Sequence, residues 1–375
     1  MSVVLCVGTS KGAAFLRSDA GRERWEVSPL QLKGWIVTAA ARDTTGRTYV
    51  AVTSDVYGAA LLASDDLEDW EQLEGAPRYA PGERGNANHN LIVGSAAPGQ
   101  LDRYRDGDRY VDQIWTLHAA GDVLYAGVSE AGLFRSDDRG KSWLPVRGLN
   151  DHETRSDWIP GAGGLCAHTV LVDPRNPERI WVGISAAGVF RSDDGGQTFA
   201  GANEGVSRDE GYCIHSLAQD PDDANVIYRQ DHRGMYRTAN GGDSWELIEN
   251  GLPVSTLGDD HECVFGFAVA LDPSTKHVFA YPLEGDSFRF PHDGRPCVYR
   301  TRDGGAHWEP CSNGLPERSY ASVLRGAMDV DGLDPCGVYF GTTSGEVYAS
   351  RDRGESWSEL SCRLPRVLCL RAFEV

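Results

Sequence analysis

The 375-residue chain lacks several features that mark membrane, secreted or helical proteins. No apolar run is long enough to span a bilayer. The start, Met1-Ser2-Val3-Val4-Leu5-Cys6-Val7, has no basic segment of the kind that opens a signal peptide. Helical spacing of apolar residues is nearly absent. The nine cysteines are an odd number without a Cys-x-x-Cys pair, which favours reduced thiols. Together these absences predict a cytoplasmic protein.

The chain is also poor in positive charge. Its 36 Lys and Arg residues stand against 55 Asp and Glu residues, which gives a formal net charge of −19. Such a charge disfavours nonspecific binding to nucleic acid and to anionic membrane surfaces. We therefore expect neither as a partner. A small molecule or a glycan is the expected ligand, and a protein partner is the alternative.

One pattern is abundant. A short aliphatic-aromatic strand runs into Ser or Thr, then into a tight acidic turn, and then into an aromatic residue. The clearest copies are residues 136–143 and 350–357. Repetition of this kind indicates a repeat architecture. Seven aromatic residues end the copies: Trp25, Trp70, Trp143, Phe199, Trp245, Trp308 and Trp357.

Each copy contains the residues of four β-strands joined by tight turns. Strands that end in Asp-Pro precede several copies, and proline ends a strand because it cannot donate to the ladder. Glycine in the acidic turn can take a positive φ angle, and the preceding Asp or Asn can accept hydrogen bonds from backbone amides of its own turn. We therefore interpret these side chains as structural: Asp138, Asp194, Asn240, Asp303 and Asp352.

The motif Ser/Thr-x-Asp-x-Gly-x-Ser/Thr-Trp resembles the Asp-box, or BNR repeat, over nearly the whole chain. This repeat is shared by sialidases, sortilin-type receptors and photosystem II assembly factors of the Ycf48 kind. The resemblance implies a β-propeller whose Asp-boxes are structural turns, away from the active face. It implies two functions: a sialidase-like hydrolase, or a noncatalytic scaffold for protein interaction or assembly.

Seven aromatic anchors predict a seven-bladed β-propeller of four-stranded antiparallel blades, formed as a single domain over residues 1–375. A propeller has to hide its end strands. The chain begins in the second strand of a unit, at residues 3–9, and carries a spare strand at residues 367–373. We expect this C-terminal strand to complete the first blade as its innermost strand.

Long loops are expected on one face, at the mouth of the central channel, where binding sites usually form. His168 and His215 occupy the same position in adjacent inner strands, and Arg325 is assigned to that position in the seventh blade. Three interpretations stay open. The histidines could hold a divalent metal, with His232 as a third ligand. They could perform acid-base catalysis with Asp259 or Glu262. They could also bond only to water and backbone.

Further ligand-binding candidates lie in loops of the same predicted face. Arg233 follows His232, and the loop at residues 284–293 combines Glu284 and Arg289 with two aromatic residues, a combination that sugar sites use. Trp158 could add a stacking surface. Sialidases hold their substrate with three arginines, one from an early Arg-Ile-Pro motif that is missing here, which argues against a true sialidase. A glycoside hydrolase-like or metal-assisted hydrolase is the remaining expectation for an enzyme. Cys166 and Cys213, each two residues before a histidine, are secondary candidates.

Overall fold

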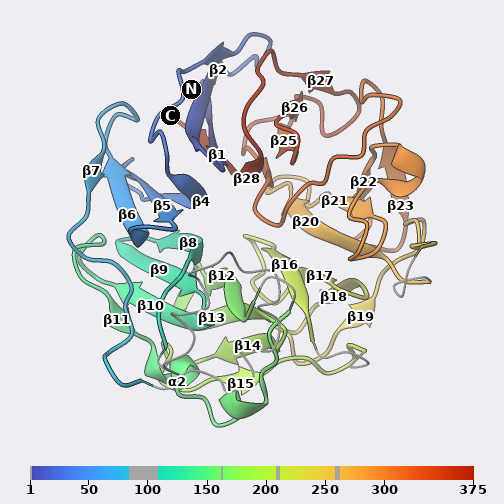
Figure 1. Cartoon of the computed structure of the whole chain (residues 1–375). Coiled ribbons are helices and arrows are strands. Elements are labelled where there is room, and N and C mark those ends of the chain that lie inside the picture. The colour runs from blue at the N-terminus through green and yellow to red at the C-terminus, as the bar shows by residue number, and fades with distance from the viewer. Residues whose placement is uncertain (1, 84–108, 162–163, 208–211, 258–261) are drawn as a thin grey trace. The chain divides into compact units, whose positions relative to one another are not determined.

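The computed structural model describes residues 2–83, 109–161, 164–207, 212–257 and 262–375. Its strands form seven sheets of four antiparallel strands each, which are the blades of a seven-bladed β-propeller (Figure 1). The predicted fold class is thereby confirmed. The contacts divide the chain into two compact units, one of Met1–Val37, Glu204–Ser207 and His215–Val375, and one of Thr38–Asn203 and Arg208–Ile214. The single domain over residues 1–375 stays a prediction.

The first unit contains four of the blades. Their strands, in sheet order, are as follows. Blade one has β28 (Val367–Glu374), β1 (Ser2–Thr9), β2 (Gly12–Asp19) and β3 (Glu26–Val27). Blade five has β16 (Ile214–Gln219), β17 (Ile227–Asp231), β18 (Gly234–Thr238) and β19 (Glu246–Leu247). Blade six has β20 (Phe265–Leu271), β21 (Val278–Leu283), β22 (Val298–Thr301) and β23 (Trp308–Cys311). Blade seven has β24 (Met328–Val330), β25 (Val338–Gly341), β26 (Val347–Ser350) and β27 (Ser358–Glu359).

The second unit contains the other three blades. Blade two has β4 (Ile36–Arg42), β5 (Thr48–Ser54), β6 (Gly58–Ser64) and β7 (Glu71–Gln72). Blade three has β8 (Ile114–Ala120), β9 (Val123–Val128), β10 (Gly132–Ser136) and β11 (Leu144–Pro145). Blade four has β12 (Cys166–Asp173), β13 (Asn176–Ser185), β14 (Gly188–Ser192) and β15 (Ala200–Gly201). Short helical turns complete the described elements: α2 (Arg147–Asn150), η3 (Arg155–Asp157) and, in the first unit, η5 (His292–Gly294).

The last strand completes the first blade, as predicted. β28 runs antiparallel to β1, with Leu5 opposite Ala372 and Val7 opposite Leu370, and the two chain ends lie side by side (Figure 1). The amide of Ser2 and the carbonyl of Val375 share a 2.9 Å hydrogen bond. The inner edge of β1, which would otherwise be an open template for aggregation, is therefore paired.

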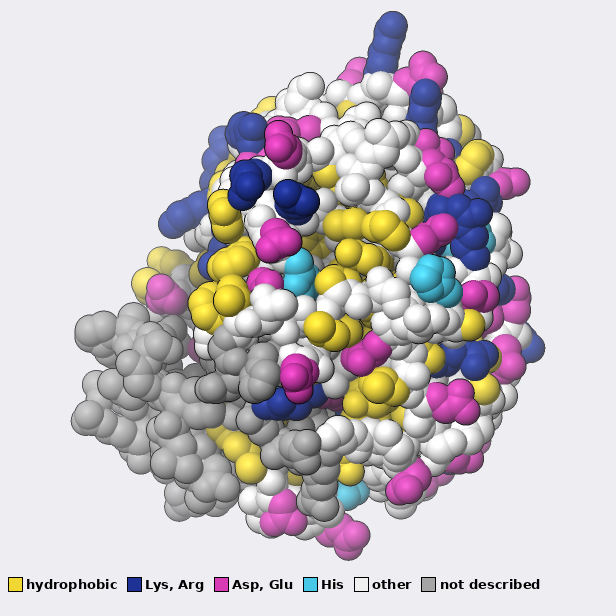
Figure 2. All heavy atoms as spheres, turned by 90° about the vertical axis from the view of Figure 1, so that its right-hand side faces the viewer, with side chains coloured by type: hydrophobic (Ala, Val, Ile, Leu, Met, Phe, Trp, Pro, Cys, Tyr) yellow, Lys and Arg dark blue, Asp and Glu magenta, His cyan; other side chains and the backbone are white. Residues whose placement is uncertain are grey.

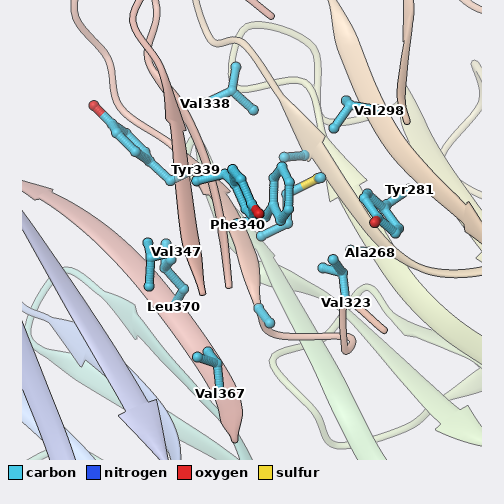
Figure 3. Packing of buried hydrophobic residues seen from close by; sticks show 14 of the residues in the cluster. Ala268, Tyr281, Val298, Val323, Val338, Tyr339, Phe340, Val347, Val367 and Leu370 are labelled. Atoms are coloured by element: carbon cyan, nitrogen blue, oxygen red, sulfur yellow. The ribbon is translucent and has the colours of Figure 1, made fainter. Parts of the chain in front are cut away.

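Alternating aliphatic and aromatic residues give each unit its own core. In the first unit, Tyr281, Phe340, Val347 and Leu370 come from four different strands and lie in one cluster (Figure 3). Aromatic rings in this cluster meet in preferred geometries, and the centroids of Phe340 and Trp357 are 5.1 Å apart in an edge-to-face arrangement. Trp357, the last aromatic anchor of the repeat, is therefore part of this core.

The Asp-box turns contain the hydrogen bonds expected of structural turns. In the copy at residues 136–143, Ser136 Oγ donates to Asp138 Oδ1 at 2.8 Å, and the amide of Ser142 donates to the same oxygen at 2.8 Å. Gly140 has a φ of 83°. These bonds lower the pKa of Asp138 to about 2, with the largest contribution from the Ser142 hydroxyl. The carboxylate is therefore ionised and occupied within its own turn.

Two findings bear on the expected environment of the chain. All nine cysteines are free thiols, in agreement with the absence of a paired pattern. Within the described ranges, no helix combines the length and the apolar character that a membrane crossing requires. The cytoplasmic location stays a prediction.

Candidate functional site

The two matched histidines connect inner strands. His168 is 8% exposed, and its Nε2 lies 2.6 Å from the carbonyl oxygen of Ile214. His215 is 2% exposed, and its Nδ1 lies 2.7 Å from the carbonyl oxygen of Gly266. In both cases a buried imidazole contacts the backbone of the next inner strand along the chain. This geometry agrees with the structural interpretation of the pair.

Two other inner strands use a different side chain for the same purpose. Thr38 Oγ1 donates to the carbonyl of Ile114 at 2.7 Å, and Cys369 Sγ lies 3.9 Å from the carbonyl of Val37. A polar side chain at this position therefore joins neighbouring inner strands in several blades. His168 and His215 do occupy equivalent positions, as the sequence indicated. The hydrogen bonds between neighbouring inner strands explain why polar side chains stand there.

The catalytic role assigned to these histidines stays a prediction. Asp259, one of the two predicted carboxylate partners, lies outside the described residues. Glu262, the other, is exposed and has a φ of 71°. Cys166 is buried, and Cys213 Sγ lies 2.9 Å from Ser185 Oγ.

Two imidazoles lie close together in the first unit. His232 follows β17, and its ring centroid is 5.5 Å from that of His215 in an edge-to-face contact. A ligand nitrogen of each ring lies within 4.8 Å of the other. Two imidazoles could serve as metal ligands, but a zinc site needs at least a third protein ligand. His168, the remaining ligand of the set predicted from sequence, belongs to the second unit, so the metal interpretation stays a prediction.

A buried ion pair stabilises the turn that holds His232. Arg229 is fully buried, and its Nη2 lies 2.5 Å from Asp231 Oδ2. The other carboxylate oxygen of Asp231 accepts the backbone amide of His232 at 2.8 Å. The guanidinium carbon of Arg229 lies 5.4 Å from the ring centroid of Trp245. Arg233, the other predicted residue of this turn, is half-buried.

Two of the predicted ligand-binding arginines converge in the first unit. The guanidinium carbon of Arg289 lies 5.6 Å from the ring centroid of Phe267, and that of Arg325 lies 4.7 Å from the same centroid. Phe267 occupies the inner-strand position that holds His215 in the preceding blade, and the centroids of these two rings are 4.8 Å apart. Arg289 and Arg325, which lie in different loops, thus share one aromatic neighbour.

Glu284 joins the two loops that flank β20 and β21. It is 3% exposed and accepts hydrogen bonds from Ser255 Oγ at 3.1 Å and from the amide of Thr256 at 3.0 Å. Its other oxygen lies 3.2 Å from Thr256 Oγ1 and 3.2 Å from His292 Nδ1. Burial opposes ionisation of Glu284, but the hydrogen bonds and the nearby His292 outweigh it, so its pKa lies below its usual range. Glu284 is therefore an anchor between loops, whereas the sequence assigned it to ligand binding.

His292 is held in one orientation by this carboxylate. Burial lowers the pKa of His292 below its ordinary value, although Glu284 acts in the opposite direction. The imidazole is therefore neutral at pH 7 and donates its Nδ1 proton to the carboxylate. The loop also holds Arg289 at a φ of 52° and Asp293 at 54°, conformations that L-residues rarely adopt. Such strain persists only where the surrounding structure imposes it, and it is common at functional sites.

An aromatic row follows the same loop. The row consists of Phe288, Phe290 and Tyr320, with successive ring centroids 5.9 Å and 5.4 Å apart. Phe288 is 42% exposed and Tyr320 is 64% exposed. Tyr320 packs against Gly294, because a Cβ at that glycine would lie 2.9 Å from the tyrosine ring. The row therefore ends beside η5.

A cavity of about 320 Å³ is lined in part by His292 and Asp293, which lie in the same loop as Phe288 and Phe290. Its walls combine apolar rings with polar groups: Pro253, Pro282, Pro296, Tyr299, His292 and Arg295. Figure 2 shows a face on which hydrophobic side chains form small groups among charged and polar ones. Burial raises the pKa of Tyr299 to about 12, so its hydroxyl keeps its proton at neutral pH. A cavity of this size and mixed lining is suited to a small polar ligand.

Sequence reasoning missed Glu249, a titratable group of the first unit. Glu249 follows β19, accepts the amide of Met235 at 3.3 Å and lies against Gly234. Burial raises its pKa to about 6. No local motif marks this residue, because its burial depends on β18 and on the start of β20, which are distant in sequence.

Trp158 lies in the second unit. It is 3% exposed and packs against His152 and Phe190, and its Nε1 donates to Thr154 Oγ1 at 3.1 Å. The guanidinium carbon of Arg155 lies 5.1 Å from its ring centroid. Trp158 is therefore part of a core in the described structure, and its ring is not the exposed stacking surface expected from sequence.

No family model matches the chain. Xyloglucanase Xgh74A of Acetivibrio thermocellus is 22% identical over 268 residues, which cover 64% of this chain and 30% of the relative. A xyloglucanase of a Paenibacillus species is 24% identical over 312 residues, which cover 71% of this chain and 28% of the relative. The chain thus spans about a third of the length of these curated relatives.

Solved structures show the same fold. The GH74 xyloglucanase of Xanthomonas campestris has a TM-score of 0.65 at 22% identity, and the match covers 95% of this chain and 52% of that one. YCF48 of Cyanidioschyzon merolae has a TM-score of 0.52 at 13% identity, and the match covers 88% of this chain and 86% of that one. At these identities the likeness shows the propeller fold alone.

Proposed function

We propose that this chain is a glycan-binding propeller of the hydrolase type, and that its site is formed by the loops of blades five to seven. The observation that carries the proposal is the row of Phe288, Phe290 and Tyr320, with two exposed rings, on the loop that also lines the 320 Å³ cavity through His292 and Asp293. Sugars present apolar C–H faces together with hydroxyl groups. Aromatic rings can pack against the former, and the polar groups of the cavity can bond to the latter.

The comparisons support a carbohydrate as the ligand. Two of the curated relatives that match more than 60% of this chain are named xyloglucanases. We therefore propose xyloglucan as the first polymer to test. The sialidase-like interpretation of the repeat has no support of this kind.

For a hydrolytic step we propose Glu249 as the proton donor. Glycosidases protonate the leaving oxygen with a carboxylic acid whose pKa is raised by its surroundings. Burial raises the pKa of Glu249 to about 6, and the residue lies four positions before Pro253 of the cavity wall. The step needs a second carboxylate, and Asp293, which also lines the cavity, is the candidate.

Binding and hydrolysis are separable by experiment. Isothermal titration with xyloglucan oligosaccharides should show binding by the wild type and at least a tenfold loss in Phe288→Ala and Tyr320→Ala. Tyr57→Ala is the matched control, since Tyr57 is 80% exposed but lies between β5 and β6 of blade two. Glu249→Gln should bind like the wild type and release no reducing sugar. If both aromatic variants bind like the wild type, the proposed site is wrong.

The noncatalytic scaffold is the alternative. It predicts that the purified chain binds none of these oligosaccharides and releases no reducing sugar. Binding that depends on Phe288 and Tyr320 would contradict it.

A further inference from the structure

Two arginines contact the same aromatic ring in a chain with a formal net charge of −19. Arg289 and Arg325 both lie against Phe267, so their guanidinium carbons are within about 10 Å of each other. They come from different loops, one between β21 and β22 and one before β24. Phe267 is 2% exposed, whereas Arg289 is exposed. Arg325 is half-buried, so the two guanidinium groups place positive charge around a buried ring, and one of them is at the surface.

The backbone around Arg289 holds the side chain in place. Its Nε donates to the carbonyl of Asp286 at 2.5 Å, and its own carbonyl accepts a hydrogen bond from the hydroxyl of Ser322. Ser322 lies three residues before Arg325, so this bond links the two arginine-bearing loops. Two positively charged groups held close together favour an anion between or above them.

Three carboxylates of the surrounding described loops have partners other than Arg289, whereas Asp293 of the same loop lines the cavity. Asp231 is paired with Arg229, and Glu284 accepts four donors from the loops beside it. Asp286 accepts the hydroxyl of Ser287 at 3.0 Å. Within the described residues Arg289 forms no ion pair with a carboxylate. The charge of this side chain is therefore presented to solvent and to a ligand.

One arginine of the pair lies within the segment that carries the aromatic row. Arg289 stands between Phe288 and Phe290 in the chain, and its guanidinium group turns to Phe267 of the inner strand β20. A glycan lying along the row would bring its substituents past this group. Arginine binds carboxylate and phosphate groups through paired N–H donors, which makes such contacts both strong and directional.

We propose that Arg289 and Arg325 bind the anionic group of an acidic sugar, a carboxylate as in a uronic acid or a phosphate ester. The inference rests on the proposed function for the presence of a glycan and adds the charge that the site selects. His215 and His232 lie beside the pair, with His215 against Phe267 and His232 against His215. The site thus combines an aromatic platform with a cationic end.

Titration calorimetry with three probes tests the proposal on the full chain: a neutral xyloglucan oligosaccharide, an oligosaccharide of the same length ending in glucuronic acid, and glucose 6-phosphate. Each anionic probe is compared with a neutral counterpart: the glucuronic acid-bearing oligosaccharide with the neutral one, and glucose 6-phosphate with glucose. In 50 mM NaCl we expect the wild type to bind at least one anionic probe ten times more tightly than its neutral counterpart. This advantage should fall at least threefold in 500 mM NaCl, since surface charges are screened there. The probe that binds distinguishes the carboxylate from the phosphate.

Variants assign the effect to the pair. Arg289→Gln, at an exposed position, should reduce the advantage of the anionic probe three- to tenfold, and Arg325→Gln should do the same. Arg302→Gln is the matched control, because it removes the same charge at the opposite end of β22, where Arg302 forms ion pairs with Glu309 and Glu355. Thermal unfolding of each variant establishes that it is folded. Equal affinity for neutral and acidic oligosaccharides overturns the inference and leaves the proposed function intact, while no binding of any probe rejects both.

Discussion

Glu284 gives the sharpest stability prediction. Its buried carboxylate accepts hydrogen bonds from Ser255, from the amide and hydroxyl of Thr256, and from His292. Glu284→Gln removes the charge and one acceptor oxygen, so at least one donor is left buried without a partner. An unsatisfied buried donor costs about 1–3 kcal/mol. We expect the substitution to lower the free energy of unfolding by about 2 kcal/mol at pH 7.

The pH dependence of this loss has a definite sign. The pKa of Glu284 is lower in the folded state than its ordinary value of 4.5. Its contribution is therefore fully present above pH 4.5 and is lost as the pH falls through the folded pKa. Urea unfolding at pH 7 and at pH 3 measures both values. The difference between wild type and Glu284→Gln should be smaller at pH 3.

A matched control separates this anchor from an ordinary surface carboxylate. Glu23 is 70% exposed and pairs with the exposed Arg351, so Glu23→Gln should change stability by less than about 0.5 kcal/mol. If Glu284→Gln is equally mild at pH 7, or if its effect is the same at pH 3, Glu284 does not join the loops as described.

Three further predictions concern other parts of the chain. Deletion of residues 367–375 leaves the inner edge of β1 unpaired, and gel filtration should show aggregation of the truncated chain where the full chain is monodisperse. His168→Ala and His215→Ala should each lower the free energy of unfolding by about 1–3 kcal/mol, because each removes a buried hydrogen bond to a neighbouring strand. A variant that loses enzymatic activity at unchanged stability would instead support a catalytic role for its histidine. Glu249→Gln should raise the free energy of unfolding by about 1 kcal/mol above pH 6 and leave it unchanged below pH 4.5. Burial raises the pKa of Glu249, so the cost of ionising it in the folded state appears as the pH rises from 4.5 to 6. Thermal unfolding of wild type and variant as a function of pH measures this difference.

The fold was readable from sequence because its signals are local and repeated. Each Asp-box turn needs only a hydroxyl, a carboxyl or amide and a glycine at fixed spacing, as in residues 136–143. The closing role of β28 followed from a strand missing at one end of the repeat and present at the other. These features do not depend on which distant residues become neighbours.

The site was less predictable because its chemistry depends on such neighbours. The sequence aligned His168 with His215, but only the structure shows that one ring nitrogen of each histidine contacts a backbone carbonyl. The sequence assigned Glu284 to ligand binding, yet its role as a loop anchor depends on Ser255 and Thr256. Glu249 carries no motif, and its raised pKa is a consequence of burial alone.

The most direct test of the proposed glycan site is hydrogen–deuterium exchange of the chain with and without a saturating xyloglucan oligosaccharide or its glucuronic acid-bearing counterpart. We expect the ligand to slow exchange in residues 284–297 and around Tyr320, and to leave exchange in the turn between β5 and β6 unchanged. Unchanged exchange at residues 284–297 together with protection only in the second unit would contradict the proposed site.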